Sequence, residues 1–190
     1  KTCFTQLRNQ LTIWGTALAV AGLLPRLAQA QPESFSPDNS LPPPAGVYVS
    51  PQLWHVAFSN GIVIRDISHE RFLEKMPPPP PGTNQTRTFG STIRFEVSTD
   101  GGVTFAPASG PANVTVTVRQ SAVAAGRVIF DTEMTQLDLT AGGFMLRESP
   151  TLPSRGKTSM RTVPGGYMIG SFFDIFTEIS DAVIVGVEIE

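Results

Sequence analysis

The sequence predicts an all-β protein with the architecture of a β-sandwich, of the Greek-key or immunoglobulin-like kind. Apolar and polar residues alternate with a period of two along much of the chain after residue 52, which is the pattern of half-buried strands. Clusters of Gly, Pro, Asn and Asp separate these runs at intervals of about 8–12 residues, the spacing found in sandwiches and barrels. Beyond the N-terminal segment, the sequence lacks the period of an amphipathic helix.

Residues 1–30 have the pattern of a secretory signal peptide. Basic residues precede the uncharged run Leu11–Leu24, and Ala28-Gln29-Ala30 has the small residues of a cleavage site. We expect cleavage after Ala30 and a secreted or extracytoplasmic protein, with an uncleaved anchor as the alternative. The run is shorter than the roughly 20 residues that span a bilayer, so no integral membrane segment is expected after cleavage. Cys3, the only cysteine, would leave with this segment.

Composition excludes several classes of function. The 190 residues are 41% hydrophobic and carry a net charge of −2, unlike disordered chains, which are polar and highly charged. No basic excess is available to neutralise phosphates, so no nucleic acid is expected as a partner. The length suits one large domain or two small ones. Lys1 at the start and Glu190 within an apolar alternation lead us to expect that the native chain extends beyond both ends.

The first strands follow a proline-rich segment, residues 31–51, which we expect to form a linker or a draped arm. Leu53–Phe58 and Ile62–Ile67 flank an Asn-Gly pair, which predicts a β-hairpin because both residues tolerate positive φ. His69–Lys75 fits either a continued strand or one helical turn. The proline run Pro77–Pro81 ends either of them and is expected to be a rigid spacer.

Further strands are expected along the rest of the chain. In Arg87–Asp100, apolar residues such as Ile93 and Phe95 alternate with polar ones such as Arg94, which predicts a half-buried strand. The remaining expected strands are Val114–Val118, Val128–Phe130, Met134–Leu139, Phe144–Leu146, Gly166–Ser180 and Val183–Ile189.

One turn resembles the Asp-box, a hairpin with the pattern Ser-x-Asp-x-Gly-x-Thr followed by an aromatic residue. The matching residues are Ser98, Asp100, Gly102, Thr104 and Phe105. A carboxylate in such a turn can accept backbone amide hydrogens of its own loop, and glycine permits positive φ. We therefore interpret these five residues as a structural turn. Asp-boxes recur in sialidases and other propeller proteins, away from the catalytic centre, so one copy says little about activity.

A weak internal duplication relates Gly90–Ser98 to Gly170–Ser180, because each ends in an acidic residue, an apolar residue and a serine. We therefore expect two related half-units. The first is a sandwich unit over residues 52–145 that contains the Asp-box hairpin. The second is a shortened β unit over residues 146–190 that packs on the first.

Several segments together resemble a group of uncharacterised secreted bacterial β-proteins. The resemblance rests on the Asp-box, on Phe130–Met134, on Met145–Ser154 and on Ser171–Glu178, among others, and covers most of residues 46–190. It implies a secreted all-β protein and brings no assigned activity. In that group a second Asp-box follows the Ser-Phe-Phe-Asp segment, and this sequence departs from the pattern there.

Metal sites find little support in the sequence. The candidate zinc ligands are His55, Asp66, His69 and Glu70. A zinc-protease helix would need a second histidine four residues after His69, where Leu73 stands. Calcium is the alternative, through Asp131, Glu133 and Asp138, but no Asp-x-Asp-x-Asp-Gly loop is present. We expect no cofactor and assign no metal ligand.

Catalytic motifs are equally sparse. Gly156-Lys157-Thr158-Ser159 matches the end of a phosphate-binding P-loop, but Thr151 stands where that motif needs its first glycine. No Gly-x-Ser-x-Gly elbow marks a serine hydrolase. Two acidic pairs, Asp174 with Glu178 and Asp131 with Glu133, have a spacing that glycoside hydrolysis could use, but solvated strand faces look the same. No residue is assigned a catalytic role.

Binding is the favoured function, because exported sandwiches without disulfides commonly serve as adhesion, carbohydrate-binding or envelope modules, an analogy at the level of fold. The candidates for a sugar-stacking platform, or else for the core, are Tyr48, Trp54, Tyr167, Phe172 and Phe176. On one strand, Phe172, Asp174, Phe176 and Glu178 would share a face, so we predict a binding surface there together with Trp54.

These expectations combine into one hypothesis with two alternatives. The hypothesis is an exported, non-catalytic structural or binding module whose partner is a glycan or another protein. The first alternative is a glycan-acting hydrolase that uses surface carboxylates. The second is a self-assembling envelope subunit that associates through the strand edge Val183–Glu190.

Overall fold

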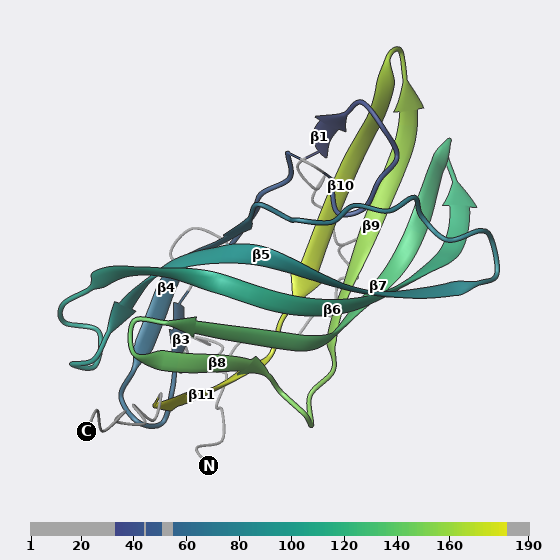
Figure 1. The fold of residues 1–190 in the computed structure, drawn as a ribbon. Coiled ribbons are helices and arrows are strands. Elements are labelled where there is room, and N and C mark those ends of the chain that lie inside the picture. Colours follow the sequence, from purple (N-terminus) through teal and green to yellow (C-terminus); the bar gives the residue numbers. More distant parts are fainter. Residues whose placement is uncertain (1–32, 44, 51–54, 182–190) are drawn as a thin grey trace, which may run out of the picture.

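The computed structural model describes residues 33–43, 45–50 and 55–181. This part of the chain forms one antiparallel sheet of eleven strands (Figure 1). It contains no helix, and hence none able to cross a membrane, so the predicted all-β class is confirmed. The strands are β1 (Glu33–Ser36), β2 (Tyr48–Val49), β3 (His55–Ala57), β4 (Val63–Glu70), β5 (Asn84–Ser98), β6 (Ala106–Ala124), β7 (Arg127–Ala141), β8 (Phe144–Glu148), β9 (Ser154–Val163), β10 (Gly166–Asp174) and β11 (Thr177–Asp181).

Three long strands, β5, β6 and β7, form the centre of the sheet. On β5, Phe89, Ile93 and Phe95 are buried, whereas Thr88 and Arg94 are exposed. The same alternation runs along β6 and β7. Because paired residues of neighbouring strands point to the same side, the three strands give the sheet one apolar face and one polar face.

The polar face carries a ladder of threonine hydroxyls. Thr86 and Thr88 on β5 lie opposite Thr117 and Thr115 on β6, and the Oγ1 atoms of both pairs are 2.9 Å apart. Thr115 also donates to Gln136 Oε1 on β7 at 3.0 Å. Cross-strand threonine pairs of this kind stabilise a sheet.

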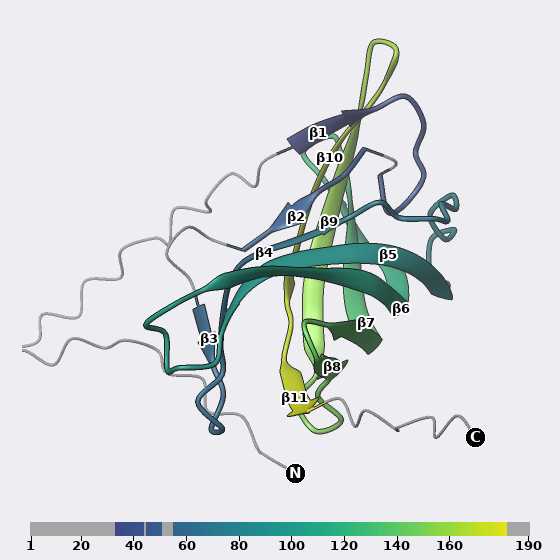
Figure 2. The same ribbon diagram turned by 60° about the vertical axis from the view of Figure 1, so that its left-hand side comes forward.

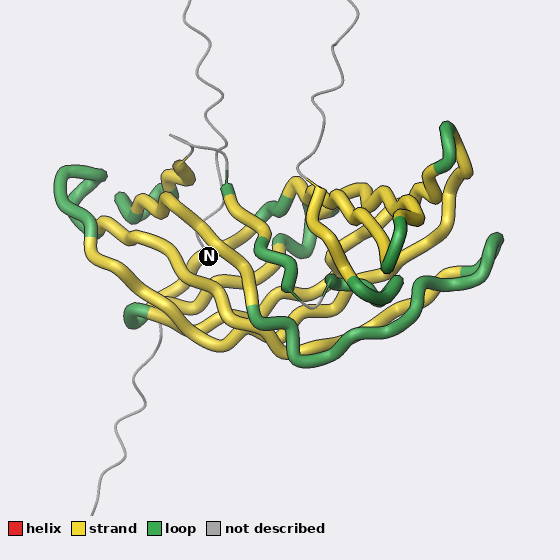
Figure 3. Tube along the Cα trace, turned by 90° about the horizontal axis from the view of Figure 1, so that it is seen from above, coloured by secondary structure: helices red, strands yellow, loops and turns green. Residues whose placement is uncertain are grey.

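The sheet branches on both sides of its centre, and this curls it. Residues 128–134 of β7 pair with β9, whereas residues 138–141 pair with β8. On β4, residues 63–65 pair with β3 and residues 68–69 with β2, with a register shift between them. Seen from above, the strands form a trough (Figure 3). A single curled sheet buries side chains on its concave face, so the apolar face lies inside.

One hydrophobic core fills the trough. Its buried side chains come from both halves of the described chain, from Ile64 on β4 to Ile179 on β11. Val114 and Phe130, on the central strands, are 0% and 1% exposed. The sheet therefore closes around a single core.

The described part of the proline-rich segment belongs to the sheet, although a linker or draped arm is expected there. β1 pairs with β10 and β2 pairs with β4 (Figure 2), so the two strands stand at opposite ends of the strand order. Between them, Leu41 N donates to Met76 O at 2.9 Å. The four residues of β1 include no proline and so keep the amide hydrogens that pairing needs.

The hairpin predicted around Asn60-Gly61 is confirmed. β3 pairs with β4, Gly61 has a φ of 85°, and Phe58 N donates to Ile62 O at 2.8 Å. β4 continues to Glu70, and Arg71 then has a φ of 57°, so His69–Lys75 is the end of a strand followed by a loop. The proline run lies outside the strands.

Two predictions about later strands are wrong. β9 lies where no strand is expected, because small residues such as Gly156 and Thr158 take the inward positions that apolar residues usually fill. Gly166–Ser180 is not one strand, because β10 pairs with β9 whereas β11 pairs with β8. Ile175 and Phe176 connect the two branches. The expected strand Val183–Ile189 lies outside the described residues.

The arrangement of two packed sheets and the division into two units stay predictions. The boundary expected between residues 145 and 146 falls inside β8, and the described strands belong to one sheet. The signal-peptide segment, residues 1–30, lies outside the described residues.

The loop between β5 and β6 is held together by Asp100. Its Oδ1 accepts from Val103 N at 3.0 Å and Thr104 N at 2.9 Å, and its Oδ2 accepts from Thr104 Oγ1 at 2.6 Å. Ser98 Oγ donates to Asp100 Oδ1 at 2.6 Å and accepts from Gly102 N at 2.8 Å. These hydrogen bonds, led by that of Ser98, hold the pKa of Asp100 well below its usual range. Ser98, Asp100, Gly102 and Thr104 are thus joined by hydrogen bonds within one turn, while the part of Phe105 in it and the likeness to Asp-boxes elsewhere stay predictions.

Candidate functional site

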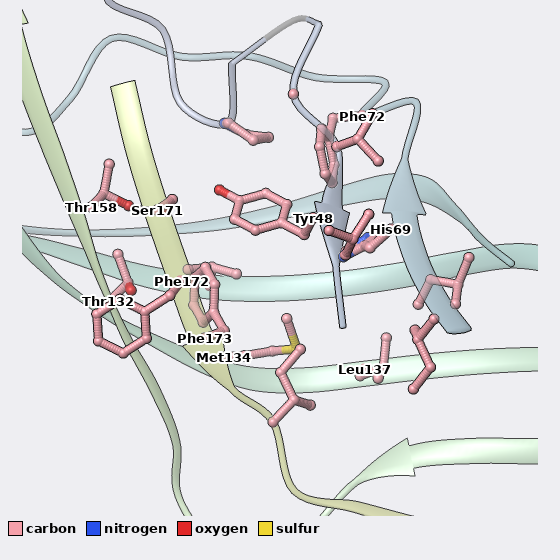
Figure 4. Close-up of a pocket in the computed structure, with 18 of the residues that line it drawn as sticks. Tyr48, His69, Phe72, Thr132, Met134, Leu137, Thr158, Ser171, Phe172 and Phe173 are labelled. Atoms are coloured by element: carbon pink, nitrogen blue, oxygen red, sulfur yellow. Dashed lines mark hydrogen bonds between the residues drawn. The ribbon is translucent and has the colours of Figure 1, made fainter. Parts of the chain in front are cut away.

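A cavity of about 580 Å³ lies between the concave face of the sheet and the N-terminal segment that crosses it (Figure 4). Small-molecule sites typically have volumes of about 300–1,000 Å³ and are lined mainly by apolar and aromatic side chains. The cavity meets both criteria, so we take it as the candidate site and describe it wall by wall.

The floor of the cavity is the apolar face of the central strands. It consists of Phe89 on β5, Val116 and Val118 on β6, and Met134 and Leu137 on β7. All five are buried. Removing an apolar ligand from water onto such a floor is favourable through the hydrophobic effect.

The cover of the cavity is the chain from Leu41 to Ser50, whose described residues 41–43 and 46–50 line it. Its first end is bridged to the loop after β4 by reciprocal hydrogen bonds between Leu41 and Met76. Its other end is fixed by Ser50 N, which donates to Ile67 O at 2.9 Å, and by the pairing of β2 with β4. The cover is therefore tied to the sheet at both ends.

An aromatic wall stands on one side of the cavity. Tyr48 contacts Phe72 and Phe173 edge to face, with ring centroids 5.8 and 5.9 Å apart (Figure 4). Phe72 in turn lies 4.8 Å from the ring of His69 and 5.9 Å from that of Phe89. Each such pair stabilises the fold by about 0.5–1.5 kcal/mol beyond the area it buries, so the wall has a fixed shape.

Hydroxyl groups gather beside Tyr48. Thr158 Oγ1 and Ser171 Oγ are hydrogen-bonded to each other, and Ser171 also hydrogen-bonds Tyr48 (Figure 4). Burial raises the pKa of Tyr48, so its hydroxyl stays protonated and can donate. Thr132 Oγ1 is buried without a hydrogen-bond partner among the described residues. These hydroxyl groups form one polar part of a mainly apolar cavity.

His69 and Ser91 form a buried pair, with Nε2 and Oγ 2.7 Å apart. Burial lowers the pKa of His69 to about 4, so the ring is neutral near pH 7. Ser91 does not line the cavity, and no described carboxylate hydrogen-bonds His69. A ligand in the cavity therefore could not reach Ser91, and the carboxylate that completes a hydrolase triad is missing among the described residues. We assign the pair a structural role.

Arg87 enters the wall from the inward face of β5 and is 6% exposed. Its Nη1 donates to Leu41 O at 2.7 Å and to Met76 O at 2.8 Å, and its Nη2 donates to Pro77 O and Gln85 Oε1. Its Nε has no partner among the described residues. The guanidinium thus holds the cover onto the sheet through neutral acceptors.

The residues predicted to form a binding surface are not on one face of one strand. Phe172, 39% exposed, and Asp174, also exposed, end β10, whereas Phe176 and Glu178 follow the break and are half-buried. Phe172, Asp174 and Phe176 lie at the rim of the cavity, and Glu178 does not line it. Trp54 lies outside the described residues.

The carboxylates considered for calcium have cationic partners instead. Asp131 forms an ion pair with Lys157, and Asp138 lies 3.9 Å from Arg147. Within the described ranges, no group of three or more His, Cys, Asp or Glu side chains is placed to hold a metal ion.

Three acidic residues that do not line the cavity meet near the start of β11. Burial raises the pKa of Glu148, and the nearby charges of Glu133 and Glu178 raise it further. None of the three lines the cavity. Asp174 ends β10 and Glu178 lies on β11, so the two acids considered for glycoside hydrolysis belong to different strands.

Sequence reasoning did not find the cavity, because its lining comes from almost every strand and follows no local motif. One signal was available. Arg87, Thr132, Thr158 and Ser171 occupy inward positions where the alternation calls for apolar residues. Polar side chains at such positions indicate an internal polar site.

The chain was also compared with known proteins. A scan against models of protein families, a search of curated proteins and a search of solved structures each found no match. The function is therefore argued from the cavity and the sequence alone.

Proposed function

We propose that this protein is an exported, non-catalytic binding module that takes a small, mainly apolar ligand into the cavity on the concave face of its sheet. One observation carries this proposal: a cavity of about 580 Å³, floored by buried apolar residues and provided with a few polar groups at defined places. Export is proposed from the signal-peptide pattern of residues 1–30. That the curled sheet is a sandwich of the Greek-key kind belongs to the same proposal.

An apolar ligand suits this site better than the glycan considered from the sequence. A sugar-stacking platform needs exposed aromatic faces, and Phe172 is the exposed aromatic residue among the described cavity residues. The rings of Tyr48, Phe72 and Phe89 are instead packed against one another. The buried floor offers apolar surface and few partners for sugar hydroxyls.

A non-catalytic role is supported by the acid–base groups of the cavity. His69 and Tyr48 are both neutral near pH 7, because burial lowers the pKa of the first and raises that of the second. Of the acidic residues lining the cavity, Glu33 is paired with Arg127 and Arg161, and Asp174 lies exposed at the rim. General acid–base catalysis needs a group with a pKa close to the working pH.

The proposal is tested by titrating the full chain with N-phenyl-1-naphthylamine, a neutral dye whose fluorescence rises in apolar sites. We expect saturable binding at one site. Val118→Phe, which adds a ring at the floor of the cavity, should weaken binding at least about tenfold while the fold is kept. The matched control is Thr117→Val, which changes the residue directly before Val118, on the opposite, polar face of β6. This variant should bind the dye as the wild type does.

Two results would contradict the proposal. The first is no saturable binding of the dye by the folded protein. The second is equal binding by the wild type and Val118→Phe, which would place the dye elsewhere. A thermal shift with an oligosaccharide but none with apolar compounds would favour the glycan hypothesis instead.

A further inference from the structure

Arg87 is a buried cation for which the described chain supplies no counter-charge. Its four hydrogen bonds go to three backbone carbonyls and one side-chain amide, all of them neutral. No acidic side chain in the described ranges forms an ion pair with it. Buried charges in proteins are normally paired, because removing a charge from water costs several kcal/mol.

The acidic residues of the cavity cannot serve as this counter-charge. Glu33 already binds two arginines, Arg127 and Arg161. Asp174 is exposed on the strand that ends at the rim. The positive charge of Arg87 is therefore left uncompensated in the wall of an apolar cavity, where the low dielectric strengthens its attraction for an anion.

We propose that the ligand is an amphipathic carboxylate, an apolar chain or ring that ends in one carboxyl group, and that Arg87 binds this group. The inference rests on the proposed function and names the class of ligand for that site. The apolar part would lie on the floor formed by Phe89, Val116 and Met134. Arg87 is among the residues that line the cavity, so the carboxylate would lie beside its guanidinium and compensate the buried charge.

A monoanion fits this site better than a phosphate. Both Nη atoms of Arg87 already donate to backbone carbonyls and to Gln85, and its Nε is enclosed, so the site offers one positive charge and no set of free donors. A phosphate carries more charge and more acceptor oxygens, and sites for it supply several charged donors. No other cationic side chain is among the described residues that line the cavity.

The test measures how well compounds with the same chain and different head groups displace the dye from the full chain near neutral pH. Dodecanoate is anionic, methyl dodecanoate is neutral and nearly isosteric, and dodecylammonium is cationic; all are used below their micellar concentrations. We expect dodecanoate to displace the dye at a concentration at least about tenfold lower than its methyl ester, because the low dielectric of the cavity wall strengthens the attraction between the carboxylate and Arg87. Dodecylammonium should be the weakest competitor.

Two variants locate the effect on Arg87. Arg87→Met keeps an unbranched apolar side chain and removes the charge, so dodecanoate and the ester should displace the dye at equal concentrations, whatever the affinity of this variant for the dye. Arg94→Met removes a charge from the exposed face of the same strand and should keep the wild-type preference. If Arg87→Met does not fold, the wild-type comparison of acid and ester still decides whether a carboxylate is preferred.

The outcomes separate this inference from the proposed function. If the ester or the amine competes as well as dodecanoate, the carboxylate inference falls and the apolar cavity site stands. If folded Arg87→Met keeps the preference for dodecanoate, the assignment to Arg87 is wrong. If the dye does not bind at all, the proposed function falls and the inference falls with it.

Discussion

Among the residues around the cavity, His69 has a titration that the fold alters. It lies on β4 between Tyr48 and Phe72, and Ser91 provides its hydrogen bond. Burial disfavours the charged ring and lowers its pKa from 6.5 to about 4. The folded protein therefore resists taking up a proton that the unfolded chain accepts.

This difference makes stability depend on pH. Below pH 6.5 the unfolded chain binds a proton at His69 and the folded protein does not, so stability falls as the pH drops towards 4. We expect His69→Gln to remove roughly 3 kcal/mol of this pH dependence. Urea unfolding of the two proteins at several pH values measures the difference. His55→Gln, at an exposed position on β3, is the control, and an unchanged slope in His69→Gln would contradict the prediction.

Asp100 is a second single residue with a clear structural effect, because its carboxylate accepts hydrogen bonds in the loop between β5 and β6. Asp100→Ala removes the acceptor of the Val103 and Thr104 amide hydrogens, so we expect both amides to exchange with solvent at least about tenfold faster. Hydrogen exchange measured by NMR checks this. Asp100→Asn keeps one acceptor oxygen and should show a smaller effect. Unchanged exchange in Asp100→Ala would mean that the backbone alone maintains the turn.

At the scale of elements, β1 closes one side of the trough through a charge cluster. Glu33 accepts from Arg127 on β7 and from Arg161 on β9, at 3.0 Å for Arg161 Nη2. These arginines, Arg127 first, lower the pKa of Glu33 despite the opposing effect of burial. Because Glu33 also lines the cavity, the cluster links the edge of the sheet to the candidate site.

Loss of this cluster should release β1. We expect Glu33→Gln to lower stability by about 1 kcal/mol and to speed amide exchange in β1 without affecting β5 and β6. Since the pKa of Glu33 is lowered on folding, its contribution is present above the ordinary value of 4.5 and is lost as the pH falls below it. Glu96→Gln, which breaks an ion pair between β4 and β5, is the control. Faster exchange of β1 in that control would show that the effect is not specific to Glu33.

The strands differ in how well the sequence predicts them, and β5 and β9 are the two extremes. The sequence of β5 predicts a strand because Phe89, Ile93 and Phe95 alternate with polar residues. β9 presents Gly156 and Thr158 to the interior, so it carries no such pattern. A Cβ at Gly156 would overlap the carbonyl oxygen of Phe172 on β10. This close approach, which belongs to the tertiary structure, decides the residue type there.

At the scale of the whole molecule, one sheet and one core predict one unfolding transition. β7 is hydrogen-bonded to β6, β8 and β9 at once, so neither branch can separate without exposing the core it shares. We expect the calorimetric and van't Hoff enthalpies of unfolding to agree. Two resolved transitions would contradict this and would favour separate units over residues 52–145 and 146–190.

The sequence by itself determined the features that depend on near neighbours along the chain. Alternation within a strand sets which residues are buried, the Asn-Gly pair sets the hairpin at Gly61, and Ser98 and Asp100 bond within their own loop. These features predicted the all-β class and most of the strands. They could not predict that Gly166–Ser180 divides between two branches, because the pairing partner of a strand depends on the other strands of the sheet as well as on its own residues.

The candidate site was decided by the tertiary structure. Tyr48 meets Phe173 and Ser171 across the trough, and Arg87 meets Leu41 under the cover, in each case far apart along the chain. Such contacts depend on the register of every strand between them and on the curl of the sheet. No local pattern encodes either quantity, so the sequence predicted the fold class and the turns, and the cavity emerged when the sheet closed around it.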